Sequence, residues 1–119
     1  MKILFYSSIG LGIEETLRTL IPEEGIEVFR SLEDLSGRLR RLCGNDTIVL
    51  LRAGDRQELS RIVSLCDLFQ RLRVILLVPD REDETISLAH RLRPRFLGSG
   101  ENDFSDTMGV LQKMIGGKV

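Results

Sequence analysis

The chain has 119 residues, of which 42% are hydrophobic, and this proportion lets one domain bury a core without disulfides or a structural metal. Its 17 basic and 18 acidic residues give a formal net charge of −1, which excludes a bulk electrostatic attraction to nucleic acid or to an anionic membrane. All apolar runs are far shorter than the roughly 20 residues of a membrane-spanning helix. We therefore expect residues 1–119 to form one soluble domain with no nucleic-acid or membrane partner.

The first half of the chain alternates short apolar strands with amphipathic helices. Residues 2–7 form an apolar run typical of a buried strand, and residues 13–21 repeat apolar side chains at helical spacing until a proline follows. Residues 26–29 alternate apolar and polar side chains, as a strand with one solvated face does. A capping-box pattern at Ser31 then predicts a helix whose apolar face continues to Leu42.

The second half repeats the same strand and helix unit three times. The predicted strands are residues 47–51, 73–78 and 95–97, and the predicted helices are residues 59–69, 86–92 and 104–115. Successive units with short links predict a parallel sheet, because each helix crosses over to start the next strand at the same edge. Right-handed crossovers then place helices on both faces of that sheet.

The composition of the strands predicts their order in the sheet. A central parallel strand is buried on both faces and is apolar throughout, whereas an edge strand need not be. The runs at residues 2–7, 47–51 and 73–78 are unbroken, while those at residues 26–29 and 95–97 are short or alternating. The predicted fold is therefore an α/β three-layer αβα sandwich of the flavodoxin-like class, with five parallel strands in the order 2-1-3-4-5.

The chain length, the five strand–helix units and the segment Asp46–Leu51 resemble the receiver domains of two-component response regulators over essentially the whole chain. In that family an acidic pair after the first strand holds Mg²⁺, and an aspartate at the end of the third strand accepts a phosphoryl group. A Thr or Ser ends the fourth strand, and a Lys follows the fifth. The resemblance implies a signalling domain. It also indicates the four positions of this chain where the residues for phosphoryl transfer would stand.

All four of these positions are changed in this chain. The acidic pair falls on Ser7 and Ser8, whose neutral hydroxyls are poor ligands for Mg²⁺. The phosphoacceptor falls on Leu51 or Arg52, and neither side chain can form an aspartyl phosphate. The last two positions fall on Val78 and Ser99. The resemblance therefore implies a degenerate receiver, or pseudo-receiver, that is not an enzyme, uses no cofactor or metal and is not phosphorylated.

Receiver domains commonly associate through the face formed by their fourth helix, fifth strand and fifth helix. The residues of this chain expected at that face are Arg91, Arg95, Phe96, Phe104 and Met108. The resemblance thus implies a cytoplasmic regulatory domain that acts by binding a protein partner of a signalling pathway. A homodimer through the same face is a further expectation.

An alternative from another class is a flavodoxin-like protein that binds a nucleotide or another small anion. The residues that would serve this function are Ser7, Ser8, Gly10, Gly12 and Arg52. Glycine amides at the start of a helix can bind phosphate, and Arg52 brings a positive charge to the strand ends where such folds hold ligands. The loop matches the flavodoxin phosphate pattern poorly, because Ile9 and Gly12 stand where that pattern has threonine.

Single polar residues near the strand ends also have structural interpretations. Asp55 and Asp80 each precede a helical stretch, which favours helix N-caps over a cation site. Arg52 is expected to pair with one of these carboxylates or with a backbone acceptor, since a half-buried cation needs a partner. Cys43 and Cys66 show no metal-site spacing and are expected to be buried apolar residues in a reducing compartment.

Overall fold

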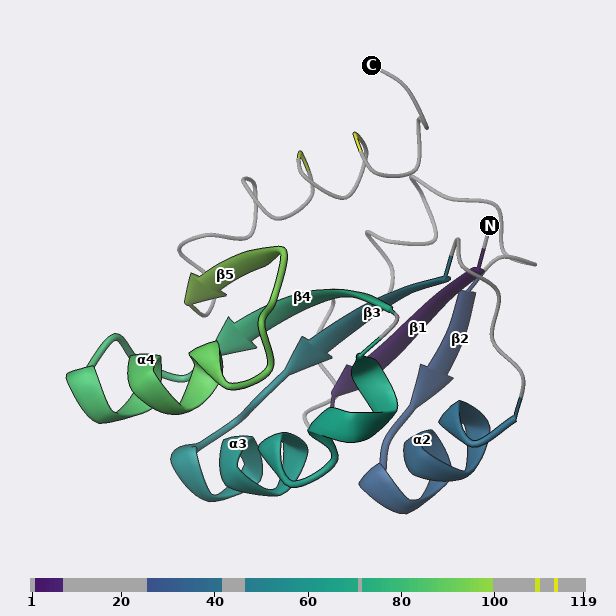
Figure 1. The fold of residues 1–119 in the computed structure, drawn as a ribbon, viewed down its shortest axis with the longest axis horizontal. Coiled ribbons are helices and arrows are strands. Elements are labelled where there is room, and N and C mark those ends of the chain that lie inside the picture. Colours follow the sequence, from purple (N-terminus) through teal and green to yellow (C-terminus); the bar gives the residue numbers. More distant parts are fainter. Residues whose placement is uncertain are drawn as a thin grey trace.

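The computed structural model describes residues 2–7, 26–41, 47–70 and 72–99, with the single residues Gly109 and Lys113. The strands are β1 (Lys2–Ser7), β2 (Ile26–Phe29), β3 (Thr47–Arg52), β4 (Arg73–Val78) and β5 (Phe96–Ser99) (Figure 1). The helices are α2 (Leu32–Leu39), α3 (Arg56–Val63) and α4 (Asp83–His90), with a 3₁₀ helix, η2 (Cys66–Phe69). The helices expected at residues 13–21 and 104–115 lie outside the described residues.

The five strands form one parallel sheet in the order β2-β1-β3-β4-β5, which confirms the predicted order. The register places Ser7 beside Arg52 and Arg52 beside Leu77. On the next pair of strands, Val78 lies beside Ser99. Because all strands run in one direction, their carboxyl ends meet at one edge of the sheet, and the described residues of the expected degenerate receiver pocket lie there.

Local capping interactions explain where two of the helices begin. The Ser31 hydroxyl accepts a hydrogen bond from the Asp34 amide at 3.2 Å, at the start of α2. The Asp55 carboxylate accepts from the Glu58 amide at 2.7 Å, at the start of α3. These contacts confirm both residues as N-caps. Within the described residues, no helix combines the length and the apolar character needed to cross a bilayer.

The sheet is buried on both faces, as the central layer of a sandwich is. One face of the sheet packs against α2, α3, η2 and α4, which lie together on the same side in Figure 1. Its buried strand residues are Leu4, Tyr6, Val49, Leu51, Val74, Leu76 and Val78. The buried residues of the opposite face are Ile3, Phe5, Ile48, Leu50, Ile75 and Leu77. This strict alternation along three strands follows from the twofold repeat of extended backbone.

Several elements differ from their sequence-based predictions. α2 ends at Leu39 instead of continuing to Leu42, and α4 spans Asp83–His90 instead of residues 86–92. The helix expected over residues 59–69 is interrupted: α3 ends at Val63, where the Ser64 hydroxyl donates to the Arg61 carbonyl at 2.6 Å, and η2 follows. The last strand is Phe96–Ser99 instead of residues 95–97, because pairing with β4 continues through Gly98. The break after α3 thus coincides with a local side-chain hydrogen bond, whereas the extent of β5 follows from its pairing with β4.

Candidate functional site at the carboxyl ends of the strands

The carboxyl edge of the sheet combines buried and solvent-facing positions. Ser7 and Val78 are almost completely buried, and Leu51 is 0% exposed within the apolar cluster. Arg52, one residue further, is half-buried and ends β3. Of the two positions considered for a phosphoacceptor, only Arg52 therefore reaches solvent. Ser99 ends β5, while Ser8, Gly10 and Gly12 lie outside the described residues.

Glu58, which the sequence indicates only as part of a helix-capping signal with Asp55, organises the loop that follows β3. Its Oε1 accepts a hydrogen bond from the Gly54 amide at 2.6 Å, and its Oε2 accepts from the Tyr6 hydroxyl at 2.6 Å. Tyr6 belongs to β1 and is only 3% exposed. One carboxylate thus ties the β3–α3 loop to the neighbouring strand. Since Tyr6 and Glu58 are 52 positions apart, no local pattern signals this contact.

The expected ion pair between Arg52 and a nearby aspartate is not found among the described residues. The Asp55 carboxylate caps α3, and the Asp80 carboxylate accepts from the Glu82 amide at 3.0 Å. Both acids are thus used to hold the starts of the segments that follow their strands. Because Arg52 is only half-buried, its guanidinium can remain hydrated without a carboxylate partner.

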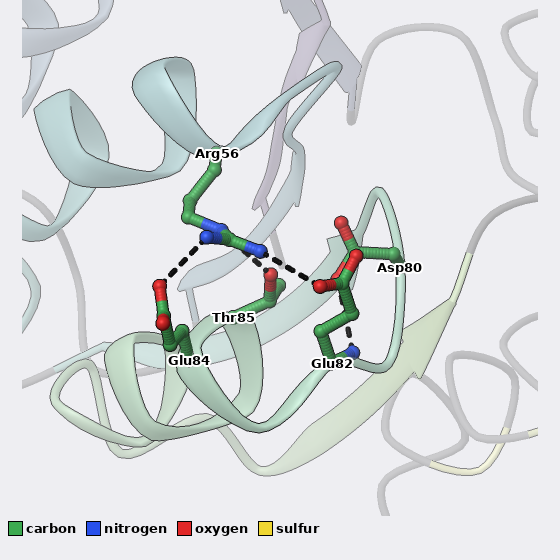
Figure 2. A network of polar contacts seen from close by, with 5 residues as sticks. All are labelled: Arg56, Asp80, Glu82, Glu84 and Thr85. Carbon is green, nitrogen blue, oxygen red and sulfur yellow. Dashed lines mark hydrogen bonds and ion pairs between the residues drawn. The ribbon is translucent and has the colours of Figure 1, made fainter.

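An unexpected polar network connects the beginnings of α3 and α4 (Figure 2). Arg56 Nε donates to the Thr85 hydroxyl at 3.1 Å. The two terminal nitrogens of the same guanidinium contact Glu84 at 2.8 Å and Glu82 at 3.4 Å. The Arg56 side chain is 40% exposed, so the two ion pairs are mostly solvated. Thr85 is completely buried, and its hydroxyl places the network directly above the core.

Asp80 belongs to the same network but does not cap α4 as expected. The N-cap residue is Glu82, whose side chain makes no capping hydrogen bond. The Asp80 side chain instead folds back onto the Glu82 amide, because two residues separate it from the first turn of the helix. A hydrogen bond from the Thr85 hydroxyl and, next in size, one from the Glu82 amide lower the pKa of the Asp80 carboxyl. Burial opposes them, and the charge of Arg56 adds the smallest lowering effect.

The lowered pKa of Asp80 predicts a specific loss of stability in acid. The ionised carboxylate stabilises the folded state at any pH above its unfolded pKa, near 3.8. We expect that contribution to disappear as the pH falls below this value towards the lower folded pKa. Asp80→Asn should therefore flatten the acid end of a plot of unfolding free energy against pH, measured by urea titration. An identical acid slope for both proteins would contradict the assignment.

The expected interface residues separate into two groups in the structure. Arg91 and Arg95 are exposed, at the end of α4 and just before β5. Phe96 is half-buried and packs against the apolar cluster on the other face of the sheet. Phe104 and Met108 lie outside the described residues. Cys66, expected to be buried, is only half-buried, because it begins η2 beyond the break after α3.

The described residues contain no group of three or more His, Cys, Asp or Glu side chains placed to hold a metal ion. At the carboxyl ends of β1 and β3 the side chains are a serine and an arginine, flanked by carboxylates that hold loop and helix amides. Together, the strand order and this edge define a flavodoxin-like α/β domain whose strand-end site is built from structural polar contacts.

The comparison with solved structures agrees with this class. A protein of Burkholderia pseudomallei provisionally assigned to pilus assembly aligns over 100% of this chain and 92% of its own, with a TM-score of 0.66 and 20% identity. A protein of Burkholderia thailandensis provisionally assigned as the pilus assembly protein CpaE aligns over 98% of both chains, with a TM-score of 0.60 and 22% identity. A designed Rossmann 2x3 protein aligns over 98% of this chain and 90% of its own, with a TM-score of 0.64 and 18% identity.

These likenesses establish the fold and nothing beyond it, because each sequence identity is 22% or lower. No family model and no curated protein matches the sequence. The similarity to a designed protein shows that this backbone arises without any selected function.

Proposed function

We propose that the chain is a receiver-like regulatory domain of the cytoplasm that is not phosphorylated and acts by binding a protein partner. The observation that carries the proposal is Arg52 at the solvent-facing end of β3, beside Ser7 at the end of β1. An acyl phosphate could form only with a carboxylate at the position of Arg52. Binding of Mg²⁺ would need anionic oxygens at the position of Ser7. A scaffold that keeps the receiver strand order without these groups retains surfaces for association.

The structural relatives support pilus assembly as the setting of this function. Two of them are proteins provisionally assigned to pilus assembly, and each aligns over nearly the full length of both chains. We propose a component of a pilus-assembly apparatus as the partner. Affinity capture of the tagged full-length chain from its native cell tests this, with identification of the retained proteins by mass spectrometry. Capture of no such component would contradict the proposal.

Phosphorylation chemistry provides the second test. We expect no gain in intact mass when the protein is incubated with acetyl phosphate and Mg²⁺, because neither Leu51 nor Arg52 can accept a phosphoryl group. A receiver domain that carries the complete set of acidic residues serves as the positive control. A base-labile gain of one phosphoryl group would refute the pseudo-receiver assignment.

A second candidate function is the binding of a small anion at the same edge. It is favoured by the half-buried Arg52, for which no described carboxylate forms an ion pair. In this case phosphate or sulfate should raise the melting temperature of the parent protein and leave that of Arg52→Ala unchanged. Equal behaviour of the two proteins with these anions would remove the candidate.

A further inference from the structure

A second surface feature lies away from the strand-end site, at the opposite edge of the sheet. A groove of about 500 Å³ runs between η2 and the end of α4. η2 leads into β4 and α4 leads into β5, so the groove lies near the amino ends of these two strands. The groove is therefore separate from the site at the carboxyl ends of the strands, where Ser7 and Arg52 lie.

The walls of the groove combine apolar side chains of the core with exposed arginines. The floor is apolar: Phe69 is 2% exposed, Leu92 is 6% exposed, and Leu72 is half-buried. The charged side chains that line it are Arg91 and Arg93, and both are exposed. An apolar centre with arginine at the rim is the usual anatomy of a protein interface, and arginine is enriched among the residues that dominate binding energy.

The groove carries positive charge without a described carboxylate in its own walls, although Arg91 also lines a neighbouring hollow together with Asp83 and Glu84. No described acidic residue forms an ion pair with Arg91 or Arg93. The nearest acid in sequence to the floor, Asp67, accepts a hydrogen bond from Gln70 at 3.4 Å. Two arginines above an apolar floor are thus complementary to carboxylates beside an apolar side chain.

The backbone at Arg93 adds an independent observation. Its φ of 52° lies in the left-handed region, and its amide donates to the His90 carbonyl at 3.0 Å as α4 ends. Glycine or asparagine is favoured at such a position, while other residues are strained there. An arginine kept there directs a guanidinium to the rim of the groove at a cost in stability, as strained residues at binding sites do.

We propose that this groove binds an acidic segment of a partner protein that places an apolar side chain between η2 and α4 and its carboxylates on Arg91 and Arg93. The inference rests on the proposed function, because it gives the protein-binding role a surface and a partner chemistry. A peptide fits better than an enclosed small ligand, since the polar groups lie on the exposed rim and only the floor is buried.

The experiment selects short peptides from a random phage-displayed library on the purified full-length chain. An enriched peptide is then synthesised and its binding measured by fluorescence anisotropy. We expect enriched sequences to carry Asp or Glu next to Leu, Phe or Met, with an affinity that falls as salt is added. No enrichment, or enrichment without acidic residues, would overturn the proposal.

Matched variants locate the binding on the groove. Arg91→Ser combined with Arg93→Gly should weaken the peptide by at least about tenfold, and glycine accepts the φ of 52° at position 93 without strain. Arg40→Ser combined with Arg61→Ser removes two exposed arginines that do not line the groove and should change the affinity by less than about twofold. Equal losses in the two double variants would show a non-specific charge effect and refute the assignment.

Two further outcomes separate this inference from the function on which it rests. If a pilus-assembly component is captured equally by the parent and by the groove variant, the groove assignment fails and the proposed function stands. If the parent chain captures no such component, the proposed function fails. Sedimentation provides the last check, because self-association of the parent that the groove variant abolishes would assign the groove to a second copy of this chain.

Discussion

Leu51→Asp is expected to prevent folding, or to lower the free energy of unfolding by at least about 4 kcal/mol. Leu51 is 0% exposed within the apolar cluster beneath α2, α3 and α4. A carboxylate at this position would have to be buried without a partner or become protonated, and both alternatives destabilise the folded state. Urea unfolding followed by circular dichroism measures the loss.

Arg52→Asp provides the control for this substitution. Arg52 is the next residue and is half-buried at the end of the strand, so an aspartate there can reach water. We expect its loss of stability to be less than about half that of Leu51→Asp. Similar losses would mean that both positions are closed to solvent, and would contradict the solvent-facing Arg52 on which the proposed function rests.

Glu58→Ala is expected to lower the free energy of unfolding by about 2–3 kcal/mol, which is the range for removing a charged acceptor from two hydrogen bonds. The alanine takes the acceptor away from the Gly54 amide and from the hydroxyl of the buried Tyr6. The helix itself should persist, because alanine is the best helix former and Asp55 still caps the amide of residue 58. Thermal and urea unfolding give the change.

A double-mutant cycle separates the Tyr6 contact from the rest of this effect. Tyr6→Phe removes the hydroxyl and keeps the ring in the core, so its combination with Glu58→Ala should be less destabilising than the sum of the two single changes. We expect a coupling free energy of about 1 kcal/mol or more. Additive effects would show that the hydrogen bond contributes nothing to stability. Glu33→Ala, which changes an exposed glutamate in the first turn of α2, is the matched control and should alter stability by less than about 0.5 kcal/mol.

The sequence by itself determined the strands and their order. The runs at β1, β3 and β4 are apolar throughout because parallel strands at the centre of a sheet are buried on both faces. Such an apolar run can be recognised from the residues of each strand alone. The caps at Ser31 and Asp55 were equally predictable, since each acts on an amide three residues away.

Only the tertiary structure decided which polar groups meet. The Arg56 side chain contacts Thr85, 29 positions later, and Tyr6 contacts Glu58, 52 positions later. Such pairs depend on the sheet order and on the direction in which each helix leaves its strand, and neither leaves a periodic signal in the chain. The same holds for the groove at Arg91 and Arg93, whose floor and rim come from segments on either side of β4.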